Sequence, residues 1–345
     1  TSLNGSSYSG PSATYCTGSR FVAFRGTDNH INIKNVNNGA LYRFLDTTYD
    51  TPSILCYANI LYVAWQTADS YHYILIGEFN QQFPCYSTPY CNFVYTANPL
   101  YYQNGNPIQT PYAPTLATDG NRIWIAWTKP NTQMYVKEST DGGASWGNEH
   151  ALNDHSANGI ALAYSSIDNQ LYLAWPGTDA ARHLNIAMYQ EADDLNHVAF
   201  LNDQVRSSLR PGIAIVADGM EKSQVSDHTE VVLTWVGTTN TNISVGSWDR
   251  ANSNNGSNGW NEIMVLSHNI FNSAVSPALV TDGVNLTYDY TDTSSNLQAQ
   301  SSRSGHAAVL FVHGFGNVNC LYPQSGGQYG DTLNDLSDFL QGQYV

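Results

Sequence analysis

The feature that most constrains this chain is a short run of β-forming residues that ends in an aromatic side chain and recurs along the sequence. Such runs of Val, Ile, Leu, Tyr and Ala are typical of buried strands. Five copies are clear and a sixth is weaker: Arg20–Phe24, Leu61–Trp65, Ile123–Trp127, Leu171–Trp175, Val231–Trp235 and Ala308–Phe311. Recurrence at intervals of some tens of residues predicts a repeated supersecondary unit.

Each unit has further parts in a constant order. A proline opens another β-forming run upstream of most copies, at Pro11, Pro52, Pro114, Pro211 and Pro277. Proline suits the first residue of a strand, where no ladder hydrogen bond is lost. Downstream, a polar turn leads to a third run such as Leu184–Met188 and to a fourth strand. The pattern predicts an all-β fold, a six-bladed β-propeller of four-stranded antiparallel blades, as a single domain over residues 1–345.

Residues 284–306 interrupt this order. They contain two additional alternating runs, Asn285–Tyr290 and Asn296–Gln300. We expect an inserted hairpin here, between the first two strands of the last blade, with Ala308–Phe311 following as the second strand. The alternative is that these runs are two strands of a sixth blade, with a partial seventh blade behind them.

Composition and charge limit the partners of the chain. Charged residues make up 12% of the 345 residues, there are 23 Tyr and 8 Trp, and the net charge is −15 at pH 7. This charge repels phosphate backbones and anionic lipids, which argues against nucleic acid as a partner. No apolar run approaches the roughly 18 residues that span a bilayer, so membrane insertion is not expected. The β-rich composition, with few charged residues, favours a secreted, extracellular protein, in mature form and with oligomerisation left open.

Five cysteines are too few for a disulfide scaffold: Cys16, Cys56, Cys85, Cys91 and Cys320. We expect a disulfide between Cys85 and Cys91, because together they close a short loop. Cys16 and Cys56 occupy similar places in the first strands of neighbouring blades, which would bring them near each other around the central channel.

The octapeptide Ser139–Trp146 fits the pattern Ser-x-Asp-x-Gly-x-Ser/Thr-Trp. Asp141 is placed to accept hydrogen bonds from turn amides, and the adjacent glycines tolerate positive φ. Together with the repeats, it resembles the Asp-box turn of the sialidase-like six-bladed β-propeller superfamily. In that family the boxes join third and fourth strands, on the face away from the active site. The resemblance therefore implies structural roles for Ser139–Trp146 and a functional face at the opposite rim.

That rim collects the turns between second and third strands and the links between blades. Its hydrogen-bonding side chains are our candidates for a glycan-binding site: Arg25, Asp28, His30, Asp69, His72, Asp179, Arg182, His183 and Arg210. Because Asp and Asn also favour turns for backbone reasons, each has a structural alternative. Among the aromatic residues, Trp65, Trp127, Trp175 and Trp235 are expected to pack between blades. Off-pattern tyrosines are better candidates for stacking on sugars: Tyr71, Tyr73, Tyr101, Tyr102, Tyr112, Tyr288 and Tyr290.

The resemblance also implies a set of catalytic residues that a sialidase would need. The family uses three arginines, a tyrosine nucleophile with a glutamate, and an aspartate acid/base. Arg25, Arg182 and Arg210 could form the clamp, but the Arg-Ile-Pro signature is missing and no helper glutamate is evident. An ordinary glycosidase pair drawn from Asp28, Asp50, Asp179 and Asp203 remains the enzymatic alternative.

Other chemistry has less support in the sequence. Motifs for serine hydrolases, phosphate-binding loops and zinc proteases are absent. Asp-rich turns could hold calcium, but no Asp-x-Asp-x-Asp run supports a dedicated loop, so no cofactor is expected. Three functions stay open: a carbohydrate-binding, lectin-like propeller, which we favour, a glycoside hydrolase, and a structural or adhesive subunit of an extracellular assembly.

Overall fold

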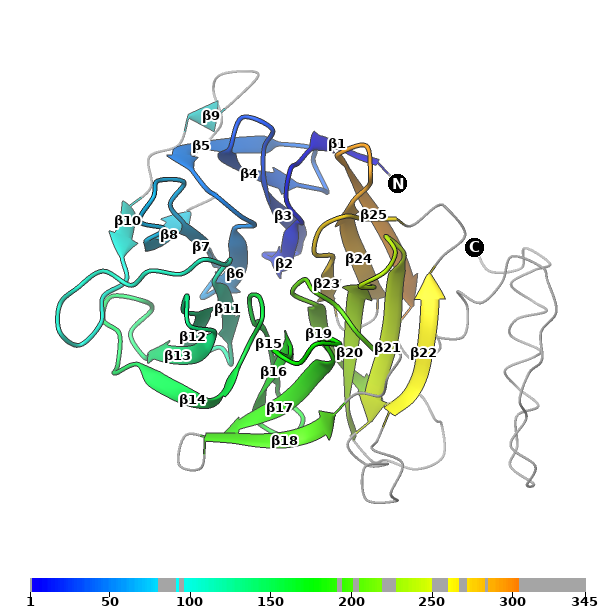
Figure 1. Cartoon of the computed structure of the whole chain (residues 1–345). Helices are drawn as coiled ribbons and strands as arrows, with labels where there is room; N and C mark the ends of the chain where they lie inside the picture. Colours follow the sequence, from blue (N-terminus) through cyan, green and yellow to red (C-terminus); the bar gives the residue numbers. More distant parts are fainter. Residues whose placement is uncertain are drawn as a thin grey trace, which may run out of the picture.

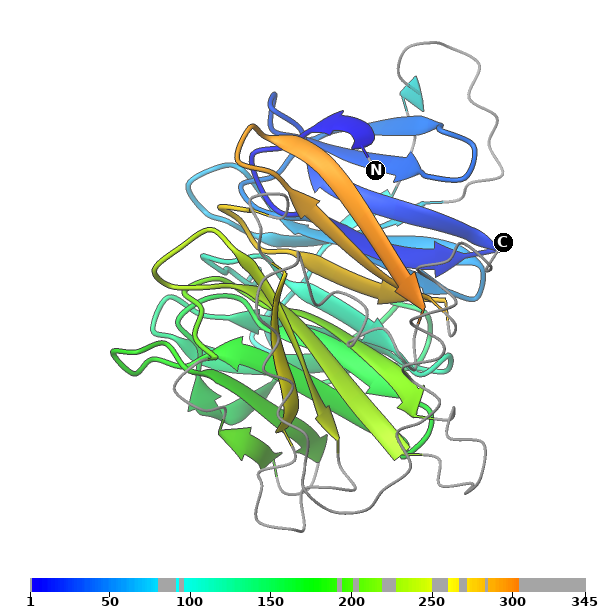
Figure 2. The same ribbon diagram turned by 90° about the vertical axis from the view of Figure 1, so that its right-hand side faces the viewer.

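The computed structural model describes residues 2–79, 91–92, 96–190, 194–200, 205–218, 228–249, 260–266, 272–282 and 285–303. In this part of the chain, six sheets are arranged radially around a central axis, and each sheet forms one blade (Figure 1). Seen from the side, the strands run across the thickness of the ring, and the turns lie on two opposite faces (Figure 2). The fold is the six-bladed β-propeller that the repeats predicted.

Blades 1 to 5 are each built from four strands that follow one another from the axis outward, except that β9 intervenes before the last strand of blade 2. Blades 1 and 2 contain β2 (Ser12–Cys16), β3 (Ser19–Arg25), β4 (His30–Asn35) and β5 (Leu41–Thr47), then β6 (Ser53–Tyr57), β7 (Ile60–Gln66), β8 (Ile74–Phe79) and β10 (Thr96–Pro99). A two-residue strand, β9 (Cys91–Asn92), pairs in parallel with β5. Blades 3 to 5 contain β11 (Thr115–Thr118), β12 (Ile123–Thr128), β13 (Gln133–Ser139), β14 (His150–His155), β15 (Ala161–Ser165), β16 (Gln170–Pro176), β17 (Leu184–Gln190), β18 (Asp194–Phe200), β19 (Gly212–Asp218), β20 (His228–Val236), β21 (Ile243–Asp249) and β22 (Trp260–Leu266).

The sixth blade joins the two ends of the described chain. It consists of β23 (Ala278–Thr281), β24 (Asn285–Thr291), β25 (Asn296–Arg303) and, as its outer strand, the N-terminal β1 (Ser2–Ser6). Residues 285–303 are therefore the second and third strands of this blade, and the expected inserted hairpin over 284–306 is wrong. Leu286, Tyr288 and Asp289 are all buried, as befits a strand covered on both faces. The predicted strand at Ala308–Phe311 lies outside the described residues.

Neighbouring blades meet through their first strands, which form a closed ring around the axis: β2, β6, β11, β15, β19 and β23. The prolines at 11, 52, 114, 211 and 277 immediately precede five of these strands, as predicted. A disulfide joins Cys16 to Cys56, with Cα atoms 5.4 Å apart, and so ties β2 to β6. The partner assignment for Cys85 and Cys91 stays a prediction, because Cys85 lies outside the described residues.

Aromatic side chains fill the space between blades. Trp65, Trp127, Trp175 and Trp235 are at most 1% exposed, which confirms their predicted role in packing. Trp65 lies edge-on to Phe44 of the preceding blade, with ring centroids 6.2 Å apart. Burying a ring of this size contributes a few kcal/mol, so these contacts are a main source of the ring's stability.

A buried ion pair joins blade 1 to blade 6. One terminal nitrogen of Arg20 lies 2.5 and 2.7 Å from the two carboxylate oxygens of Asp289. Asp289 is fully buried and Arg20 is 8% exposed. Since these charges come from the first and last blades, the pair stabilises the place where the ring closes.

A buried serine or threonine opens each of the six links between blades: Ser7, Thr48, Thr110, Ser156, Ser207 and Ser273. Its N–H donates to a carbonyl in the preceding blade's turn between second and third strands, at 2.8–3.1 Å in all six links. The hydroxyls of Ser7 and Thr110 also donate to carbonyls of the next blade, Arg25 at 2.7 Å and Thr128 at 2.8 Å. This residue therefore bridges adjacent blades, and we call the set the interblade hydroxyls.

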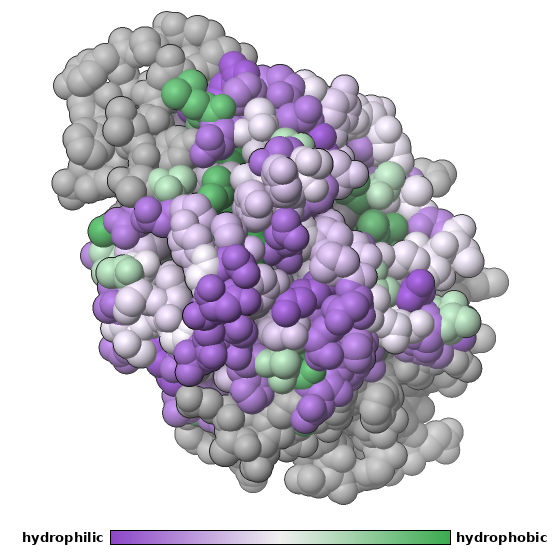
Figure 3. Space-filling model, turned by 60° about the vertical axis from the view of Figure 1, so that its left-hand side comes forward, coloured by the Kyte–Doolittle hydropathy of each residue, from purple (hydrophilic) through white to green (hydrophobic). Residues whose placement is uncertain are grey.

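The face shown in Figure 3 is mostly hydrophilic, with small separate hydrophobic patches. In the described part of the chain, no helix is long and apolar enough to cross a membrane.

Candidate functional site

The predicted rim carboxylates cap their own turns. Asp28 accepts a hydrogen bond from the N–H of His30 at 3.2 Å and forms an ion pair with Arg43 at 2.5 Å. Asp69 accepts the N–H groups of Tyr71 and His72, at 3.0 and 3.1 Å. These bonds are among the causes that lower the pKa of Asp69, although burial opposes them.

Asp179 has the same local role in blade 4. Its carboxylate accepts the N–H groups of Ala181 and His183, at 2.9 and 3.3 Å. The Nδ1 atom of His183 lies 3.0 Å from the same carboxylate. Arg182 adopts a left-handed backbone conformation, with φ of 59°, and its guanidinium donates to the carbonyl of Gly177 at 3.3 Å. Hydrogen bonds within the turn therefore account for the presence of Asp179, Arg182 and His183 at these positions.

The basic residues of blades 1 and 2 are also engaged locally. Arg25 donates to the carbonyl of Tyr49 at 2.7 Å and to the side chain of Asn29 at 2.9 Å. The Nδ1 atom of His30 lies 3.1 Å from the carbonyl of Phe44, and that of His72 lies 3.2 Å from the carbonyl of Thr67. The predicted ligand-binding role of these residues stays a prediction.

Arg210 is buried, with 8% of its surface exposed. Its guanidinium, which reaches from the link between blades 4 and 5, donates to the hydroxyl of Thr115 in blade 3 at 2.8 Å. Burial lowers the pKa of Arg210, and the charge of Asp50 opposes that shift. Asp50 in turn accepts the N–H of Ala113 at 3.3 Å. Asp50 and Arg210 thus hold inner segments of different blades together, while Asp203 lies outside the described residues.

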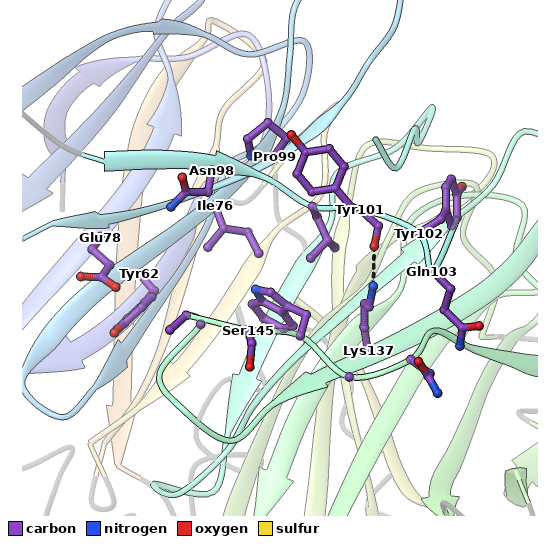
Figure 4. Close-up of a pocket in the computed structure, with 16 residues that line it drawn as sticks. Tyr62, Ile76, Glu78, Asn98, Pro99, Tyr101, Tyr102, Gln103, Lys137 and Ser145 are labelled. Carbon is purple, nitrogen blue, oxygen red and sulfur yellow. Dashed lines mark hydrogen bonds between the residues drawn. The ribbon is translucent and has the colours of Figure 1, made fainter. Parts of the chain in front are cut away.

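A pocket of about 640 Å³ lies elsewhere, on the flank between blades 2 and 3 (Figure 4). Its volume is within the range of about 300–1,000 Å³ typical of small-molecule sites. Strands β7, β8 and β10, the segment after β10, strand β13 and the following turn supply its lining: Tyr62, Ile76, Glu78, Asn98, Pro99, Leu100, Tyr101, Tyr102, Gln103, Lys137 and residues 143–148.

Aromatic rings and polar groups both line this pocket. Tyr62 and Glu78 lie together at one end, and Tyr101, in the segment after β10, lies beside Pro99 at the edge of the pocket (Figure 4). Tyr101 is 46% exposed, so its ring is available to a ligand. Burial, together with the charge of Glu78, raises the pKa of Tyr62 to about 12. The Tyr62 hydroxyl therefore stays protonated at neutral pH and can donate a hydrogen bond.

Lys137 and Glu149 of blade 3 hold the segment that carries Tyr101. The ammonium group of Lys137 donates to the carbonyl of Tyr101 and lies 3.7 Å from the carboxylate of Glu149. Glu149 also accepts the N–H of Gln103 at 3.1 Å. Burial lowers the pKa of Lys137, and Glu149 opposes this shift. These contacts fasten the blade 2 side of the pocket to blade 3.

The turn at Ser139–Trp146 forms the other wall. It joins β13 to β14, as predicted, and Asp141 accepts the N–H of Ser145 at 2.8 Å and the hydroxyl of Ser139 at 2.8 Å. The hydroxyl of Ser145 also donates to Asp141, and these hydrogen bonds lower the pKa of Asp141 to about 2. Because Trp146 lines the pocket, this turn lies beside the candidate site, whereas the resemblance placed it away from the functional face.

Part of this pocket could be predicted from the sequence. Tyr101 and Tyr102 were among the tyrosines proposed for stacking, and both line it. Tyr288 and Tyr290, proposed with them, are buried in β24, so that expectation is wrong. Tyr62 and Glu78 were missed, because each belongs to a regular strand whose sequence gives no sign of a pocket. Within the described residues, no group of three or more His, Cys, Asp or Glu side chains could hold a metal ion.

Known proteins resemble this chain in fold. No protein-family model and no curated protein sequence matches it. The solved structure of AofleA from Arthrobotrys oligospora matches with a TM-score of 0.63 at 11% identity, over 88% of this chain and 86% of that one. The Aleuria aurantia lectin, described as a six-bladed β-propeller with a novel fucose recognition mode, matches with a TM-score of 0.59 at 10% identity, over 88% and 94%.

An enzyme is also among the similar structures. The α-L-arabinanase of Penicillium chrysogenum, solved with arabinobiose, matches with a TM-score of 0.56 at 8% identity, over 85% of this chain and 92% of that one. At such identities, the likeness concerns the fold alone. Lectins and glycoside hydrolases both use this fold, so function has to be argued from the site.

Proposed function

We propose that this protein is a carbohydrate-binding, lectin-like propeller that binds glycans in the pocket between blades 2 and 3. The observation that carries the proposal is the lining of that pocket, where Tyr101 and Trp146 accompany Glu78 and Asn98. Aromatic rings offer a flat apolar surface to the C–H face of a pyranose, and carboxylate and amide groups bind its hydroxyls. The fold of known fucose lectins supports this reading.

The site is held in shape before any ligand arrives. Lys137 and Glu149 position the segment of Tyr101, and Asp141 orders the turn of Trp146. A preformed site loses little conformational entropy on binding, which favours affinity for a small polar ligand. We infer an extracellular role, since the disulfide between Cys16 and Cys56 is typical of oxidising compartments.

A glycan array followed by calorimetric titration of the best ligand tests the proposal. We expect Trp146→Ala and Tyr101→Ala each to weaken binding about tenfold or more, as loss of an aromatic contact of 1–2 kcal/mol would. Tyr71→Ala is the matched control, because Tyr71 is 57% exposed and does not line the pocket. Binding that persists in both pocket variants but is lost in Tyr71→Ala would contradict the proposal and would place the binding site on the rim.

The same purified protein can be tested for glycoside hydrolase activity. Incubation with the bound oligosaccharide, followed by chromatography of the products, should return it intact. Cleavage that is lost on substitution of one rim aspartate, such as Asp28→Asn or Asp179→Asn, would establish an enzyme instead.

A further inference from the structure

The charges around the pocket between blades 2 and 3 bear on which sugars it accepts. Of its lining residues, Glu78 and Lys137 are charged. Lys137 is 4% exposed and already interacts with Glu149 and the carbonyl of Tyr101. Its positive charge is thus balanced within blade 3, and little of it is left for an anionic ligand.

Glu78 is in the opposite situation. It is exposed at the end of β8, and among the described residues no Lys, Arg or His lies within ion-pairing distance of its carboxylate. Its neighbour in the pocket is the protonated hydroxyl of Tyr62. A ligand in the pocket therefore meets one uncompensated negative charge beside aromatic rings, on a protein whose net charge is −15.

We propose that the pocket selects sugars that carry a free, protonated amino group, of the glucosamine type. This inference rests on the proposed function and specifies its ligand. An ammonium group forms a charge-assisted hydrogen bond with a carboxylate, and the faces of Tyr and Trp attract cations. The same features repel uronic and sialic acids, because their carboxylates would face Glu78 without a free cation to receive them.

Two oligosaccharides that differ only at the amino group test the proposal. Oligomers of β-1,4-linked glucosamine and of N-acetylglucosamine have the same ring and linkage, and the acetyl group removes the charge. At about pH 6, where an amine of this kind is protonated, we expect the glucosamine oligomer to bind about tenfold more tightly. In Glu78→Gln this preference should disappear, whereas Asp46→Asn, which removes one negative charge from β5 of blade 1, should leave it unchanged.

The outcomes separate the two proposals. Equal affinity of the oligomers, with binding still lost in Trp146→Ala, would overturn the amino-sugar selectivity and leave the carbohydrate-binding function standing. A preference that persists in Glu78→Gln would assign it to the overall charge and would also overturn the selectivity. If neither oligomer nor any other glycan of an array binds, the proposed function itself fails.

Discussion

The ion pair between Arg20 and Asp289 allows a quantitative test of how the ring closes. With an effective dielectric constant of about 20 and a separation of about 3–4 Å, the attraction between the charges is about 4–6 kcal/mol. Desolvation of two buried charges offsets most of this gain. Asp289→Asn removes one charge and leaves the guanidinium of Arg20 buried without its counter-ion. We expect the free energy of unfolding to fall by about 3–5 kcal/mol.

Urea denaturation followed by tryptophan fluorescence measures this change. The isosteric control is Asp28→Asn, which weakens the more exposed ion pair with Arg43 and should cost about 1 kcal/mol or less. The double variant Arg20→Met with Asp289→Leu removes both charges. Its loss in free energy of unfolding should be clearly smaller than the sum of the losses in Arg20→Met alone and Asp289→Leu alone. A loss below about 1 kcal/mol for Asp289→Asn, or additive single losses, would refute the reasoning.

Three further predictions concern the rest of the scaffold. Thr110→Val removes a buried hydroxyl that bridges blades and should lower the free energy of unfolding by about 1–3 kcal/mol in urea denaturation, while Val at the exposed Thr140 should have almost no effect. Replacing Cys16 and Cys56 by serine should cost about 2–4 kcal/mol, because the disulfide closes a loop with a sequence separation of 40, and an unchanged melting temperature would contradict this. The folded-state pKa of Asp141, about 2, lies below the unfolded value of about 3.9, so its contribution is present above about pH 4 and lost as the pH falls toward 2. The difference in melting temperature between the wild type and Asp141→Ala should therefore shrink over that interval, and a constant difference would argue against the ionised carboxylate.

The parts of the fold that follow from local chemistry could be predicted from the sequence. Prolines immediately precede inner strands, because a strand can begin there without losing a ladder hydrogen bond. Side chains of a strand alternate between the two faces of its sheet. Trp65 and its counterparts occupy equivalent positions in their strands, so all of them could be placed on the face between blades. Cys16 and Cys56 occupy similar places in the first strands of neighbouring blades, so their proximity could also be predicted.

Ring closure was not predictable in this way. Ser2–Ser6 contains one buried apolar side chain, Leu3, and Asn4 has a positive φ of 50°, so the segment gives no strand signal of its own. It becomes a strand by pairing with β25, nearly three hundred residues away. Without this outer strand, the runs at 285–303 had no evident blade to complete, and an inserted hairpin was the simpler interpretation.

The candidate site was only partly predictable for a related reason. Tyr101 could be selected because it lies outside the regular pattern, but Tyr62 and Lys137 lie in ordinary strands of two blades. Their convergence depends on how blades 2 and 3 are placed side by side. The rim carboxylates carried the stronger sequence signal, yet that signal came largely from the turns that they cap.

The most direct test of the central claim is a crystal structure of the protein with its best glycan ligand. Carbohydrate binding between blades 2 and 3 predicts ordered sugar density against Tyr101 and Trp146, with a hydroxyl or amino group within hydrogen-bonding distance of Glu78. Sugar density confined to the rim turns around Arg25, Asp69 or Asp179, with the pocket between blades 2 and 3 empty, would contradict it.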